Sequence, residues 1–208
     1  MLENNRLNEL LLRFPEDVQV IFKEMISSYQ LGYVDYVYQT DNHATQNRRI
    51  KNLAKNFRKM DYFYIMPLPQ DLALEIANQW HYQPPLDVYN FSVDSAAYAE
   101  LISSEARGER YFAVIRNAAL MGYFCIDQDG ATVDICLGMK PSLIGLGNGR
   151  AFYQTIEDYI VEQYQPDSLK LTVAFSNQIA QTLFRAVGFT EREKQAEYIK
   201  MEKKVQCD

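Results

Sequence analysis

Three glycines at alternate positions, Gly145, Gly147 and Gly149, separate an apolar strand-like run from a predicted helix that begins at Arg150. Glycine allows successive backbone N–H groups of such a loop to point toward one place, and the N-terminus of the following helix adds partial positive charge. Together these features can bind phosphate oxygens. A flexible connector between a strand and a helix could carry the same residues, so the loop alone leaves both interpretations open.

Two common nucleotide-binding patterns do not fit this loop. No Gly-Lys-Ser/Thr sequence follows the glycines, as a P-loop requires. The preceding strand, residues 131–139, follows other short strands closely, whereas a dinucleotide-binding fold opens with a βαβ unit.

A second pattern lies downstream, where a predicted strand over 169–175 is followed by Asn-x-x-Ala, a helix and Gly-Phe. The order of these features resembles the acetyl-CoA-binding half of the GNAT acetyltransferases. Four residues match in register: Asn177, Ala180, Gly188 and Phe189. Gly145 and Gly147 also match the family signature Q/R-x-x-G-x-G/A. The resemblance covers about residues 62–203 and implies an α/β GNAT fold, with a mixed sheet that is antiparallel in its first half and has helices on both faces.

The resemblance implies transfer of an acetyl group from acetyl-CoA to an amine, by direct attack of the amine. Backbone amides of the loop would hold the pyrophosphate. The loop residues are Leu143, Ile144, Gly145, Leu146, Gly147, Asn148 and Gly149. Leu137, Gly138 and Met139 would pair with the pantetheine arm as an added strand does, and Asn177 would contact that arm or the thioester region.

Two residues depart from the family pattern. Position 142 is Ser, where the family usually has Gln or Arg, so Arg150 is the nearest cation for the phosphates. Phe184 stands where a tyrosine often protonates the departing thiolate, and a phenyl ring cannot donate a proton. Another group or solvent would have to supply that proton.

Candidates for the chemistry itself are few. Asp134, or a water that it holds, is the candidate base for the incoming amine, and its alternative is an ordinary residue on the polar face of a strand. A backbone N–H of the 137–139 segment could stabilise the developing oxyanion. Cys136 could act as a nucleophile, but no histidine lies near it in the sequence, so we expect a buried core thiol.

The amine acceptor would approach an aromatic segment near residue 85. The candidate acceptor residues are Trp80, Tyr82, Asp87 and Tyr89. Asp87 could attract a cationic amine, and the rings could form a wall of the site. Aromatic clusters also form cores, so packing remains the alternative.

The hydrophobic periodicity changes near residue 60. Before it, apolar residues recur at helical spacing up to Phe14 and over 16–28, 31–39 and 45–59. After it, strands (62–66, 110–116, 120–127, 131–139, 169–175, 189–193, 197–202) interleave with helices (70–80, 94–103, 150–164, 177–187). The pattern predicts a helical module over 1–60 and an α/β domain over 61–208.

The predicted module is similar, over residues 14–59, to the helical motif of the YdeI/OmpD-associated (bacteriocin-protection) family. The similarity lies in Ser27-Ser28-Tyr29, Tyr33 to Val37 and Thr45 to Ile50. Its last helix carries six basic residues, which could bind nucleic acid or form a solvated face. We expect the solvated face and no nucleic-acid partner, because no recognition pattern accompanies the charges.

Composition restricts the remaining possibilities. The chain has 208 residues, a net charge of -6 and 48% hydrophobic residues, as expected for a folded protein that does not coat polyanions. No apolar run is long enough to span a membrane, so we expect a cytoplasmic protein. Cys125, Cys136 and Cys207 have no CxxC spacing, and two histidines suggest no metal site; the two cysteines in strands should be buried, reduced thiols. A homodimer, a ligand sensor without catalysis, and a helical nucleic-acid module with a regulatory domain remain open.

Overall fold

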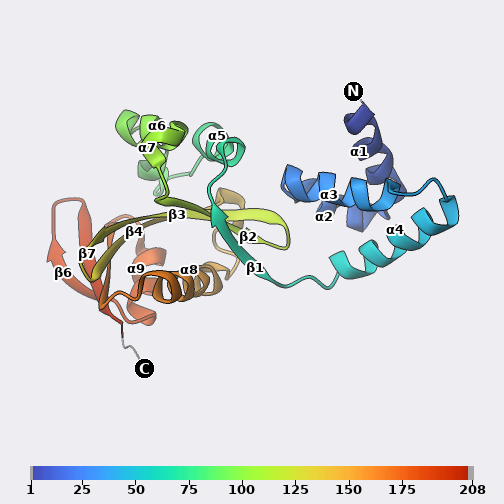
Figure 1. Ribbon diagram of the computed structural model, residues 1–208. Helices are drawn as coiled ribbons and strands as arrows, with labels where there is room; N and C mark the ends of the chain where they lie inside the picture. The colour runs from blue at the N-terminus through green and yellow to red at the C-terminus, as the bar shows by residue number, and fades with distance from the viewer. Residues whose placement is uncertain (1, 206–208) are drawn as a thin grey trace. The chain divides into compact units, whose positions relative to one another are not determined.

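The structure, a computed structural model, describes residues 2–205 (Figure 1). The chain divides into two compact units. The N-terminal unit runs to Tyr64 and also contains Ile115–Leu120, whereas the C-terminal unit contains Ile65–Val114 and the chain from Met121 onward. None of the helices in the described residues combines the length and apolar composition needed to cross a membrane.

Helices build the N-terminal unit, as the periodicity predicts. They are α1 (Leu2–Arg13), α2 (Glu16–Glu24), α3 (Ser27–Tyr38) and α4 (His43–Phe57). Two predicted boundaries are wrong, because α2 ends at Glu24 and α3 already begins at Ser27. The residues between them, Met25 and Ile26, are extended, and the Ile26 N–H donates to the Ala118 carbonyl at 2.8 Å.

The core of the N-terminal unit is aromatic and aliphatic. Phe14 lies 5.2 Å from Phe22 and 5.6 Å from Phe57, measured between ring centroids. Ala118, from a turn distant in sequence, is fully buried in the same cluster. The compact unit is therefore discontinuous in sequence, and the boundary at residue 60 remains a prediction.

A seven-stranded sheet has the order β1-β2-β3-β4-β5-β7-β6. Its strands are β1 (Phe63–Pro67), β2 (Tyr111–Arg116), β3 (Ala119–Asp129), β4 (Thr132–Met139), β5 (Ser168–Ala174), β6 (Thr190–Lys194) and β7 (Tyr198–Lys204). β4 and β5 are parallel, whereas β3/β4, β5/β7 and β6/β7 are antiparallel. The predicted α/β class with a mixed sheet is confirmed.

Helices cover both faces of the sheet in the C-terminal unit. On one face lie α5 (Gln70–Gln79), α6 (Ser95–Ile102) and α7 (Ser104–Arg107), and on the other α8 (Gly149–Tyr164) and α9 (Gln178–Ala186) (Figure 1). Successive strand residues point to opposite faces. Accordingly Tyr123 contacts Trp80 after α5, at 6.0 Å between centroids, while Phe124 contacts Tyr159 of α8 at 5.9 Å.

Candidate functional site

The two parallel strands at the centre of the sheet diverge. β4 pairs with β5 only from Thr132↔Ser168 to Asp134↔Lys170. β4 nevertheless continues along β3 to Met139, and β5 continues along β7 to Ala174. Beyond Asp134, in the described chain, the two strands therefore present facing backbone edges to each other without pairing. An extended ligand with amide groups can pair with such an edge as an added strand does.

The glycine loop follows directly from the diverging end of β4. A short 3-10 helix, η2 (Pro141–Leu143), leads into Gly145 and Gly147, whose φ angles are +79° and +81°. A side chain at either glycine would meet no atom, but it would force a residue with a Cβ into a left-handed conformation. The two glycines are therefore required by the path of the backbone and not by packing.

The loop ends at the N-terminus of α8, a helix of 16 residues. Asn148 precedes it, but its side chain does not cap the helix; it donates to the Leu143 carbonyl at 3.1 Å instead. The first-turn N–H groups of α8 consequently have no side-chain acceptor from their capping residue, and the helix dipole adds partial positive charge there. This arrangement can bind an anion. Arg150, the predicted cation, is exposed in the first turn.

Asn177 lies beyond the end of β5, at the start of α9. Its Oδ1 accepts the N–H of Ala180 at 3.0 Å, so the Asn-x-x-Ala pattern is an N-cap. Gly149 brings the start of α8 against the side of α9, because a Cβ there would lie 3.1 Å from Leu183 Cδ2. The predicted loop and α9 therefore lie side by side, and a residue larger than glycine would displace Leu183.

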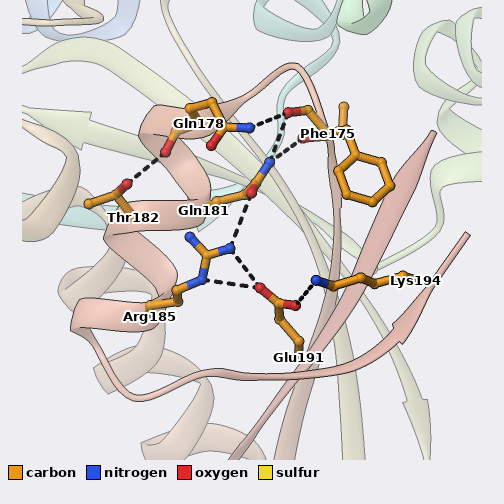
Figure 2. Close-up of polar contacts among 8 residues, drawn as sticks. Phe175, Gln178, Gln181, Thr182, Arg185, Glu191 and Lys194 are labelled. Carbon is orange, nitrogen blue, oxygen red and sulfur yellow. Dashed lines mark hydrogen bonds and ion pairs between the residues drawn. The ribbon is translucent and has the colours of Figure 1, made fainter. Parts of the chain in front are cut away.

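A buried glutamine that the sequence did not indicate holds α9 to the end of β5. Gln181 Nε2 donates to the carbonyls of Ala174 and Phe175, each at 3.0 Å, and its Oε1 accepts from Arg185 at 3.2 Å (Figure 2). Gln178 adds a bond from the surface to the Phe175 carbonyl at 2.7 Å. The sequence signal that could have indicated this role is a glutamine at an otherwise apolar position of the predicted helix over 177–187.

Two of the predicted acceptor residues reach the diverging strands. The hydroxyl of Tyr82 donates to the Met139 carbonyl at 2.9 Å, at the end of β4. The hydroxyl of Tyr89 accepts the N–H of Ala174 at 2.9 Å, at the end of β5, and lies 3.5 Å from Asn177 Nδ2. The two rings are in contact, with centroids 6.5 Å apart. Burial raises the pKa of Tyr82, so this hydroxyl stays protonated at neutral pH.

Three other predicted residues have different surroundings. Trp80 is 4% exposed and packs on Tyr123, so its ring offers little surface to an acceptor. Asp87 is exposed in the short 3-10 helix η1 (Asp87–Tyr89). Phe184 is buried against Tyr153 and Phe189.

Glycine at position 138 is required by packing. A Cβ on Gly138 would lie 2.6 Å from the ring of Tyr123, closer than two carbon atoms can approach. Its neighbours Leu137 and Met139 are partly buried on the diverging part of β4.

Asp134 is the last residue of β4 that pairs with β5. It is exposed, and it lies opposite Asp127 of β3 and Lys170 of β5. Burial of part of the side chain raises the pKa of its carboxyl, the charge of Asp127 raises it further, and Lys170 opposes the shift. A carboxylate with a raised pKa at the opening between two strands is suited to accept a proton.

The prediction for one of the cysteines is wrong. Cys125 is buried, as expected, but Cys136 is exposed. The reason is that Cys136 shares the exposed face of β4 with Asp134, whereas Val133 and Ile135 on the opposite face are buried. Cys207 lies outside the described residues.

A separate groove of about 690 Å³ lies within the N-terminal unit. Its lining residues are Ser28, Tyr29, Gly32, Tyr33, Tyr36, Asn52, Leu53 and Asn56. None of them is among the predicted cofactor or acceptor residues, so the groove gives no support to those predictions.

Comparisons with known proteins identify the fold. No protein-family model and no curated protein sequence matches the chain, so the similarity of residues 14–59 to the bacteriocin-protection family is not shown. Among solved structures, N-acetyltransferase PseH from Campylobacter jejuni has a TM-score of 0.53 at 17% identity, over 71% of this chain and 99% of its own. PseH has also been solved with acetyl coenzyme A.

Two further structures agree. The PaiA N-acetyltransferase from Thermoplasma acidophilum, solved with coenzyme A, has a TM-score of 0.52 at 15% identity, over 69% of this chain and 99% of its own. The ribosomal-protein-S18-alanine N-acetyltransferase from Escherichia coli has a TM-score of 0.51 at 18% identity, over 71% and 96%. The chain has the fold of these N-acetyltransferases.

Proposed function

We propose that this protein is a GNAT-type N-acetyltransferase that uses acetyl-CoA and a small-molecule or peptide amine. The observation that carries the proposal is the divergence of β4 from β5, which continues into the glycine loop and the start of α8. The segment from β4 to the start of α8 thus offers a backbone edge that can pair with an extended amide chain, and a helix N-terminus that can bind phosphates. In this proposal residues 61–208 form the catalytic domain, and residues 1–60 form a separate helical module.

The chain's own groups would divide the work of binding. Backbone N–H groups from Leu143 to Gly149 would hold the pyrophosphate, with Arg150 nearby. The edge from Leu137 to Met139 would pair with the pantetheine amides, and Asn177 would contact the same arm. The fold fits this ligand because the loop glycines adopt the left-handed backbone that lets their N–H groups converge.

Catalysis would consist mainly of positioning. Asp134 would take one proton from the amine, directly or through a water, as the new N–C bond forms and the C–S bond breaks. Phe184 cannot return a proton to the departing thiolate. We propose Tyr89 for this step, because its oxygen accepts the Ala174 N–H and its own hydrogen is left for donation. Tyr89→Phe should then lower kcat more than it changes KM for acetyl-CoA; equal changes would indicate a positioning role.

Calorimetric titration with acetyl-CoA tests the cofactor site. We expect micromolar binding that Gly147→Glu abolishes, because the variant adds a negative charge and strain to the loop. Gly130→Glu is the matched control: Gly130 also has a positive φ, of 58°, and open space around it, but it lies in the β3–β4 turn. Absence of binding in the wild-type protein would refute the proposal. Binding without thiol release against any amine would favour a sensor instead.

A further inference from the structure

Two thiols face each other across neighbouring strands of the sheet. Cys125 of β3 is the register partner of Cys136 of β4. Directly opposed residues of an antiparallel pair have Cα atoms roughly 4.5–5.5 Å apart, which lies within the range of about 4.4–6.8 Å for disulfides. The two thiols lie close enough for each to shift the pKa of the other. A bond between the sulfurs would therefore need no change of register.

The two thiols differ in exposure and in acidity. Cys136 is exposed and Cys125 is buried. The neighbouring Cys125 thiol lowers the pKa of Cys136, although burial of the Cys136 thiol opposes the shift. The neighbouring Cys136 raises the pKa of Cys125, and burial raises it further. A thiol with a lowered pKa on an exposed strand residue, opposite a thiol with a raised pKa, is the arrangement of an attacking and a resolving cysteine.

The groups around the pair leave Cys136 the better nucleophile. Tyr111 lies near Cys125 and partly opposes the rise in the pKa of that thiol. The carboxylates Asp134, Glu100 and Asp127 disfavour a thiolate on Cys136, but each contributes less than the neighbouring Cys125 thiol does. Since strand residues alternate, Cys136 shares its face of β4 with Asp134. A group attached to Cys136 would therefore lie next to the candidate base.

We propose that Cys125 and Cys136 form a redox-active dithiol that reduces a small-molecule disulfide. The Cys136 thiolate attacks one sulfur of the disulfide, forming a mixed disulfide and releasing the first thiolate. Cys125 then loses its proton and attacks the Cys136 sulfur, forming the Cys125–Cys136 disulfide and releasing the second thiolate. The two leaving thiolates take up the two protons of the protein thiols. In sum, one disulfide is reduced and the protein pair is oxidised by two electrons.

A consequence for acetyl transfer rests on the proposed function above. The mixed disulfide would occupy the space beside Asp134, where the amine must approach. Protein held at the mixed disulfide, as Cys125→Ser should be, is therefore expected to lose acetyl transfer, and a reducing agent should restore it. Binding of acetyl-CoA through the glycine loop should persist, because the loop lies beyond the end of β4.

Intact-mass spectrometry of native protein treated with oxidised glutathione tests the dithiol. All variants carry Cys207→Ser, so that only the strand pair can react. We expect a transient glutathione adduct that converts to a product lighter than the starting protein by two hydrogen atoms. Cys125→Ser should stop at the adduct, whereas Cys136→Ser should form neither species. Circular dichroism checks that each variant is folded, and Cys125→Ala serves as a second variant if Cys125→Ser unfolds.

Several results would overturn the proposal. They are no reaction of the wild-type pair under conditions where a free thiol reacts, an adduct that never resolves, or oxidation that persists in Cys136→Ser. Titration of acetyl-CoA into the same samples keeps the two proposals apart. If the protein forms the strand disulfide but does not bind acetyl-CoA, the dithiol proposal stands and the acetyltransferase proposal fails.

Discussion

Replacing Gln181 with Met tests whether one buried side chain holds α9 to the end of β5. The change keeps an unbranched side chain of similar volume, so it leaves little cavity. It removes the buried hydrogen bond to Ala174 and the partly buried one to Phe175, each 3.0 Å long. It also removes the bond that Gln181 accepts from Arg185, but Arg185 keeps Glu191 as a partner. Each such bond contributes roughly 0.5–1.5 kcal/mol to stability, so we expect a loss of about 2 kcal/mol. The loss stays moderate because both carbonyls keep another donor.

Thermal unfolding followed by circular dichroism measures this loss. For a chain of this size about 1 kcal/mol lowers Tm by roughly 2–4 °C, so the variant should melt about 4–8 °C below the wild type. Gln178→Met is the matched control, because Gln178 is exposed and donates to the same Phe175 carbonyl (Figure 2). It should cost less than about 0.5 kcal/mol. Equal Tm shifts in the two variants would refute the reasoning that burial makes the Gln181 hydrogen bonds contribute more to stability than the exposed Gln178 bond.

Three further predictions concern the C-terminal unit. Asp134→Asn should remove the rise of activity that the wild type shows as the pH passes through the raised pKa of this carboxyl. A raised pKa means that the fold disfavours the charged form, so the variant's Tm at pH 7 should be equal to or higher than that of the wild type. A lower Tm would contradict this. Lys203→Met should cost about 2–4 kcal/mol in denaturant unfolding, since it strips the buried Glu157 of its ion-pair partner, and adding Glu157→Gln should recover most of the loss. Gly122→Ala should cost about 1–3 kcal/mol, because its Cβ would lie 2.4 Å from Phe152, whereas Gly32→Ala in open space should cost nothing.

The sequence alone predicted those features of the structure that depend on residues close together in the chain. The glycines of the loop, the N-cap at Asn177 and the period of most helices and strands are short-range features. A left-handed backbone at Gly145 and Gly147 follows from steric limits within a few residues. The fold class followed from the order of these local elements, and the structure bears it out.

The sequence could not place residues whose role depends on distant partners. Tyr89 and Ala174 are 85 positions apart, and no local pattern indicates that a tyrosine hydroxyl meets a strand N–H there. Trp80 was assigned to the acceptor wall because it is aromatic, but packing against Tyr123 buries it. The predicted ends of α2 and α3 differ from the observed ones because the Ile26 N–H donates to the carbonyl of Ala118, in a turn that is distant in sequence.

The cysteines show the same division most clearly. Alternation along each strand predicts which residues share a face, but it does not say which strand pairs with which, or in what register. The β3–β4 register sets Cys125 against Cys136, and the position of Cys136 on the exposed face of β4 leaves this residue exposed. The sequence determined the elements, because they depend on torsion angles and hydrophobic period within a few residues. The tertiary structure alone decided which thiols and hydroxyls meet, because chain closure brings together residues between which the sequence carries no local signal.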